Sequence, residues 1–201
     1  MDEIADDLAV LVVDVCVKHV SEVESDRVLY GLALMFEWGV CDWTMWAPLP
    51  VMLDSRRLSV ETVDDPIRSY WDPWLPPADL WARADEIDGG LVGALPGVSE
   101  ELQADRTFRE LAEAFERMYL EWSEQGEPVG VETSDDLGPE SRYAIKVARG
   151  LGARDLSTLR IPTMADFVTF PVTTWPETLE LVRAAVPPRQ LEAIRQRGKL
   201  P

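Results

Sequence analysis

Several segments of the chain carry apolar residues at every third or fourth position, which is the spacing of one face of an α-helix. The first segment begins at Leu8, and the acidic residues before it suit the positive end of a helix dipole. We expect this helix to end near Ser21. A longer amphipathic helix is predicted between Thr107 and Gly126. Further helices are predicted from Pro139 to Gly152 and on both sides of the Pro187-Pro188 pair.

Two consecutive segments have the pattern of β-strands. Residues 28–36 form an apolar run without a charge, which is typical of a strand buried on both faces. Residues 41–47 alternate between apolar and more polar side chains, with Cys41, Trp43 and Met45 on one face, as in a half-buried strand. The Glu37-Trp38-Gly39 turn between them predicts a β-hairpin. A shorter strand is predicted at 129–133.

Together these segments predict an α+β fold, in which a small, mainly antiparallel sheet has helices packed on it. The length of 201 residues fits a single domain, residues 1–201. Within it we expect residues 155–201 to form a C-terminal helical extension. Residues 48–97 contain many prolines and glycines and are predicted to be irregular.

The charge of the chain is strongly negative and unevenly distributed. There are 37 acidic residues against 19 Lys and Arg, which gives a formal net charge of -18. Residues 1–140 hold 32 acids and 9 bases, whereas residues 141–201 hold 5 acids and 10 bases. The asymmetry indicates either attraction between the two parts or an acidic face that is left for a partner. A field of this sign disfavours nucleic acid and anionic membranes as partners and favours a basic protein.

Candidates for catalysis and metal binding are few. His19 is the single histidine, so sites with several histidines are excluded. Cys16 lies one helical turn before it, which allows a cysteine–histidine pair but is more typical of a core thiol. Cys41 is the second cysteine, and with no signal peptide in the acidic N-terminus we expect both thiols to be free in the cytoplasm. We expect no cofactor, no metal and no catalytic residue of a common class. The frequent acidic pairs leave a carboxylate-dependent, metal-assisted enzyme as the alternative.

Tryptophan is concentrated between Trp38 and Trp81. Exposed tryptophan surrounded by carboxylates is typical of protein-binding hot spots. The other interpretation is that aromatic rings fix an irregular loop to the sheet. The candidate partner-binding residues are Trp46, Asp64, Asp65, Trp71, Asp72 and Trp74.

Short motifs along residues 5–155 resemble a bacterial family of small acidic proteins, the domain of unknown function 4303 family. The motifs are Tyr30-Gly31, Trp71-Asp72-Pro73 with Trp81, the aromatic helix from Phe108 to Trp122, Ser134-Asp135 and Glu140-Ser141. The chain departs from the family at Leu151-Gly152, where the family has Leu-Asn. Some members resemble proteins encoded near toxin genes, so the resemblance implies an immunity or antitoxin-like role. The sequence therefore favours a cytoplasmic, acidic protein-binding module that neutralises a basic toxin, and a structural interaction module is a further alternative.

Overall fold

The computed structural model describes residues 2–24, 26–36, 43–59, 70–71, 92–124, 137–154, 160–173 and 177–199. Its centre is a four-stranded sheet with the strand order β3-β2-β1-β4. The strands are β1 (Leu29–Met35), β2 (Leu49–Asp54), β3 (Val92–Ala94) and β4 (Thr163–Val172). The β1–β2 and β2–β3 pairings are antiparallel and the β1–β4 pairing is parallel. The predicted α+β fold with a small, mainly antiparallel sheet is confirmed.

The partner of the charge-free strand is not the predicted one. Trp43–Trp46 forms a short 3₁₀ helix, η1, and β2 begins after it at Leu49. β2 pairs with β1 through Leu34 opposite Pro50 and Met35 opposite Leu49. The predicted strand at 41–47 is therefore wrong for its described part. The physical reason is that Trp46 turns into the core from η1, where burial of a large ring outweighs a weak alternating pattern.

The C-terminal part of the chain is an integral part of the sheet rather than a helical extension. β4 lies parallel to β1, with Ala33 opposite Phe170 and Met35 opposite Val172. This ten-residue strand is followed by α8 (Glu177–Ala185) and α9 (Pro188–Gln196). The sequence prediction missed β4 because its exposed first half breaks the apolar pattern, while its second half is buried.

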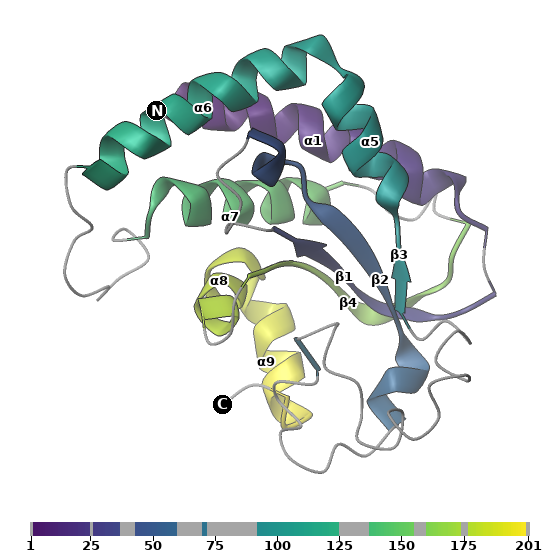
Figure 1. The fold of residues 1–201 in the computed structure, drawn as a ribbon. Helices are drawn as coiled ribbons and strands as arrows, with labels where there is room; N and C mark the ends of the chain where they lie inside the picture. Colours follow the sequence, from purple (N-terminus) through teal and green to yellow (C-terminus); the bar gives the residue numbers. More distant parts are fainter. Residues whose placement is uncertain are drawn as a thin grey trace, which may run out of the picture.

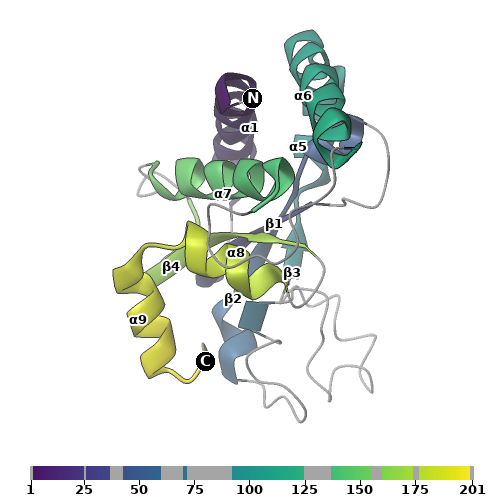
Figure 2. The same cartoon turned by 90° about the vertical axis from the view of Figure 1, so that its left-hand side faces the viewer.

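The helices form layers on the two faces of the sheet. Helices α1 (Asp2–Glu22), α5 (Pro96–Ala104), α6 (Arg106–Glu124) and α7 (Pro139–Gly152) cover one face. Helix α8 lies along β4, and α9 packs beyond it on the other face (Figure 1). The view from the side shows α1 and α6 on the far side of α7 from α9 (Figure 2).

Each face of the sheet has its own hydrophobic core. Leu32, Leu34 and Phe36 of the β1 segment point to the core under α1, α6 and α7. Tyr30 and Ala33 point to the second core, and an irregularity in register between Leu29 and Gly31 shifts the alternation. The second core contains Tyr70, Trp71, Phe170, Val182 and Ile194. The prediction that residues 28–36 form a strand buried on both faces is confirmed for 29–35.

Candidate functional site

The two described tryptophans that were predicted to contact a partner are both core residues. Trp46 and Trp71 have no exposed surface. Trp46 packs edge-on against Phe115 and Tyr143, with ring centroids 4.7 and 5.9 Å away. Trp71 packs against Phe170 at 4.8 Å. The prediction of partner contact is therefore wrong for these two side chains, because burial of the rings fixes irregular segments to the sheet.

The remaining predicted partner-binding residues, Asp64, Asp65, Asp72 and Trp74, lie outside the described residues. Cys41 and the strand predicted at 129–133 also lie outside them. Among the described residues, many exposed carboxylates lie on two helices, α1 and α6, which pack against each other.

Carboxylates line the exposed surface of these two helices. On α1, Glu3, Asp7 and Val10 recur at helical spacing and are all exposed. Val10 keeps 57% of its surface accessible, and Leu120 of α6 keeps 45%. We call this surface the acidic helical face, and we define it by its exposed side chains, in which five carboxylates outnumber one arginine: Glu3, Asp7, Val10, Glu113, Arg117, Leu120, Glu121 and Glu124.

The acids of this face are distinct from those that the C-terminal part of the chain neutralises. Asp6 pairs with Lys146 at 2.5 Å, Asp14 pairs with Arg154, and Glu24 pairs with Arg160. Each of these ion pairs joins an acid of residues 1–140 to a base of residues 141–201. In the part of the chain that the structure describes, no ion pair involves an acid of the acidic helical face. Attraction between the two parts of the chain therefore accounts for some of these acids, and the acids of the acidic helical face take no part in it.

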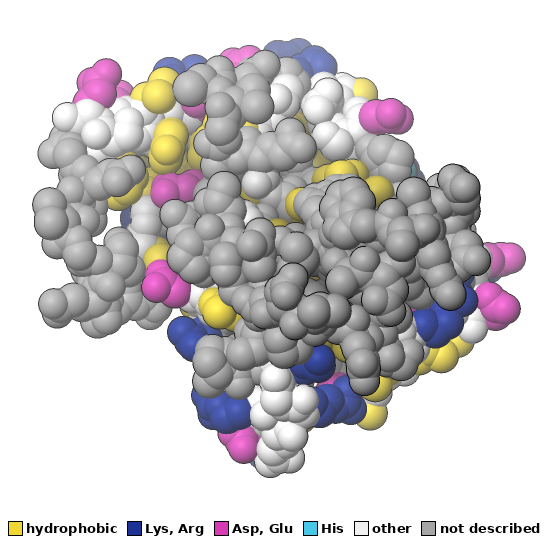
Figure 3. Space-filling view, turned by 60° about the horizontal axis from the view of Figure 1, so that its bottom comes forward, with side chains coloured by type: hydrophobic (Ala, Val, Ile, Leu, Met, Phe, Trp, Pro, Cys, Tyr) yellow, Lys and Arg dark blue, Asp and Glu magenta, His cyan; other side chains and the backbone are white. Residues whose placement is uncertain are grey.

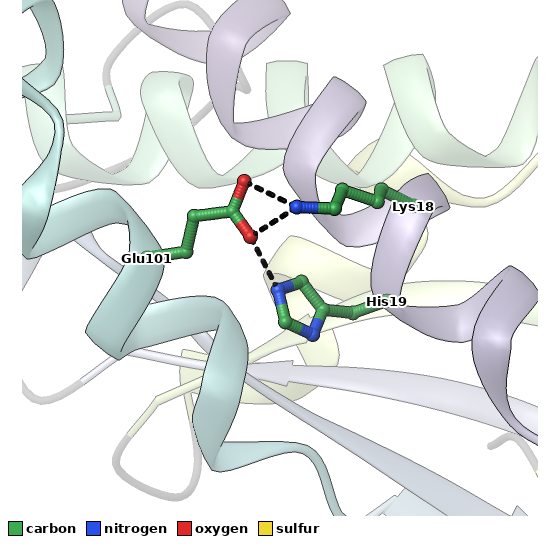
Figure 4. Close-up of polar contacts among 3 residues, drawn as sticks. All are labelled: Lys18, His19 and Glu101. Carbon is green, nitrogen blue, oxygen red and sulfur yellow. Dashed lines mark hydrogen bonds and ion pairs between the residues drawn. The ribbon is translucent and has the colours of Figure 1, made fainter.

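A polar cluster at the junction of α1 and α5 contains the single histidine (Figure 4). Lys18 Nζ donates hydrogen bonds to both carboxylate oxygens of Glu101, at 2.9 Å to Oε1 and 2.7 Å to Oε2. His19 Nε2 lies 2.8 Å from Oε2 of the same carboxylate. The hydrogen bond from Lys18, together with that from His19, lowers the pKa of Glu101 below its usual value. The other ring nitrogen, Nδ1, faces the first turn of α5, where a Cβ on Gly97 would lie only 3.2 Å away. The cluster acts as a clamp that joins α1 to α5 through Glu101.

Cys16 does not form a catalytic pair with His19. Its side chain is fully buried among the residues of the first core. Burial raises the pKa of its thiol to about 12, because a thiolate would lose its hydration. The thiol therefore stays protonated at neutral pH. The prediction that Cys16 is a free core thiol is confirmed.

A second polar cluster lies under α9 and was missed in the sequence. Asp166 of β4 is 12% exposed in its side chain, and Arg197 Nη1 lies 2.8 Å from its Oδ2. The hydroxyl of Tyr70 is buried nearby, and burial together with the charges of Tyr30 and Asp166 raises the pKa of this phenol. The sequence held one signal for this cluster, because Asp166 is the single charged residue of the strand Thr163–Val172.

In the described part of the chain, no helix has the length and apolar character needed to cross a membrane. Within the same residues, no three side chains of His, Cys, Asp or Glu lie close enough to hold a metal ion. The described surface that remains for a functional proposal is the acidic helical face and the cluster around Asp166.

No protein-family model, no curated protein and no solved structure matches this chain. The resemblance to the domain of unknown function 4303 family therefore stays a prediction from short motifs.

Proposed function

We propose that this chain is an acidic protein-binding module that binds a basic protein. An immunity or antitoxin-like role in the cytoplasm, in which the partner is a basic toxin, is the specific form of this proposal. The observation that carries it is the acidic helical face, whose carboxylates have no ion-pair partner among the described residues. The tryptophans Trp46 and Trp71 are not part of the contact surface.

The acidic helical face has the two properties that a charged recognition surface needs. Its carboxylates contribute to the net charge of the whole chain, which is -18. A negative field of this kind accelerates the approach of a basic partner, and salt screens it. Val10 and Leu120 offer apolar side chains between the charges. Apolar side chains that are buried in a complex mainly slow dissociation, because their contacts have to be lost before the partner can leave.

The same charge argues against nucleic acid as the partner. A duplex carries one negative charge about every 1.7 Å along its axis, and binding relies on Lys and Arg at its phosphates. The acidic helical face would repel such a ligand. The resemblance to proteins encoded near toxin genes points in the same direction, towards a basic protein.

The product of the adjacent gene is the partner to test, because immunity proteins are encoded beside their toxins. Binding is measured as association and dissociation rates at several salt concentrations. Glu113→Gln/Glu124→Gln on α6 should slow association and flatten its dependence on salt. Asp26→Asn/Glu180→Gln is the matched control, because it removes the same charge from exposed positions away from α6.

Two results would contradict the proposal. One is an adjacent product that neither binds this chain nor is neutralised by it on co-expression. The other is equal behaviour of the two double variants, which would show that the long-range field acts but that α6 is not at the contact.

A further inference from the structure

The cluster under α9 contains buried polar atoms that the described contacts leave without hydrogen bonds. Both carboxylate oxygens of Asp166 and the hydroxyl of Tyr70 are inaccessible to solvent, and no described residue forms a hydrogen bond with them. Arg197 is close enough to Asp166 for an ion pair, but its geometry does not give a hydrogen bond. A buried carboxylate in this condition is costly, so the site favours a better placed donor.

The chemistry of that donor follows from the acceptors. Two carboxylate oxygens suit the fork of a guanidinium group, which can donate two parallel hydrogen bonds to them. A guanidinium has further N–H groups, and the hydroxyl oxygen of Tyr70 can accept one. Arg197 already brings a guanidinium to the site, and its side chain remains 43% exposed. The residue thus stands at the boundary between the buried acceptors and solvent.

The position of the site in the fold is well defined. Asp166 lies on β4 in the stretch where the pairing with β1 is irregular, and its ion pair with Arg197 places its carboxylate on the α9 side of the sheet. Tyr70 is 3% exposed and packs against Tyr30 in a tilted arrangement, with ring centroids 4.9 Å apart. The space-filling view from below shows Lys and Arg side chains gathered around α9 at the lower end of the molecule (Figure 3). This face is opposite the acidic helical face.

We propose that Asp166 and Tyr70 form a binding site for an arginine side chain of a partner protein, and that Arg197 of the same chain occupies this site in its absence. Arg197 is an intramolecular substitute with imperfect geometry, which a partner's arginine displaces. The proposal does not depend on the acidic helical face, so either one can fail without the other.

Chemical rescue tests the acceptors directly. Arg197→Ala empties the site, and the small cation methylguanidinium is the probe. We expect methylguanidinium to raise the Tm of R197A in a saturable way, because it binds the folded state. Methylammonium should raise the Tm less, because it is not a planar fork that matches both oxygens. Arg195→Ala is the matched control, since Arg195 is an exposed arginine that pairs with Glu192 on the same helix.

A second measurement identifies the site and the competition. The indole N–H resonance of Trp71, assigned with Trp71→Phe, reports binding even if the Tm of R197A equals that of the wild type. N-acetyl-argininamide should shift this resonance in R197A, and wild type should need about tenfold more ligand if Arg197 fills the site about 90% of the time. The shift should be lost in Asp166→Asn/Arg197→Ala, or in Tyr70→Phe/Arg197→Ala if the first double variant does not fold.

The proposal is overturned if R197A gives no saturable response to either guanidinium probe, or if R195A responds equally. Equal affinity of wild type and R197A for N-acetyl-argininamide would show that Arg197 does not occupy the same site. A response that survives in the double variant would place the bound guanidinium elsewhere.

Discussion

The indole N–H of Trp71 donates a hydrogen bond to the carbonyl oxygen of Lys199 at 2.8 Å, across 128 positions of the sequence. The turn after α9 makes this contact possible. Gly198 adopts a positive φ of 69°, and Lys199 N donates to the carbonyl oxygen of Ile194, so the chain reverses at the end of the helix. The end of the chain and the second core therefore stabilise each other.

Trp71→Phe should destabilise the protein, because it removes this hydrogen bond and part of a fully buried ring. A lost hydrogen bond to the partly buried carbonyl of Lys199 costs about 0.5 to 1.5 kcal/mol, and lost packing adds to it. The free energy of unfolding is measured by urea denaturation. Trp122→Phe is the control, because Trp122 is only partly buried on α6, and it should cost clearly less. Similar losses in both variants would argue against the contact with Lys199.

Trp46→Ala distinguishes a core residue from a partner-binding residue. Trp46 is fully buried, and truncation of such a ring costs about 3 to 5 kcal/mol of unfolding free energy. Trp46→Phe should cost much less, because the Trp46 N–H finds no acceptor in the described part of the chain. An unchanged stability of Trp46→Ala by urea denaturation would restore the interpretation that this side chain serves an interface.

The two thiols should be free, and at least one should be inert in the folded protein. Titration in denaturant without reductant should find both Cys16 and Cys41. In the folded protein, Cys16 should resist alkylation near neutral pH, because burial raises its pKa to about 12 and blocks access. Mass spectrometry after alkylation identifies the modified cysteine. Rapid modification of Cys16 in the native state, or a disulfide in fresh protein, would contradict this.

The clamp of Glu101 with Lys18 and His19 should make stability depend on acid pH. The pKa of the Glu101 carboxyl is lower in the folded chain than its ordinary value of 4.5. The stabilising effect of the ionised Glu101 is therefore fully present above pH 4.5. The effect is lost as the pH falls through the lowered pKa. We therefore expect Glu101→Gln to be less stable than wild type at neutral pH, with the difference shrinking below about pH 4. Glu100→Gln, the exposed neighbour, is the control, and a pH-independent difference would contradict the clamp.

The sequence alone determined much of the layered fold. Apolar spacing identified the helices at residues 2–22, 106–124 and 139–152, because one buried stripe every 3.6 residues is a local property. The absence of charge identified β1, because a strand covered on both faces cannot carry a solvated side chain. The sign and asymmetry of the charge also followed from the sequence, and three ion pairs between the two parts agree with it.

Only the tertiary structure decided what depends on contacts between distant segments. Packing decided that Leu49–Asp54 pairs with β1 and that β4 joins the sheet. Packing also decided that Trp46 and Trp71 are buried, because a tryptophan has the same local sequence signal in a core as on a surface. The meeting of Asp166, Tyr70 and Arg197 is of the same kind. The role of a lone acid in a strand depends on the side chains that surround it, and these come from segments far apart in the sequence.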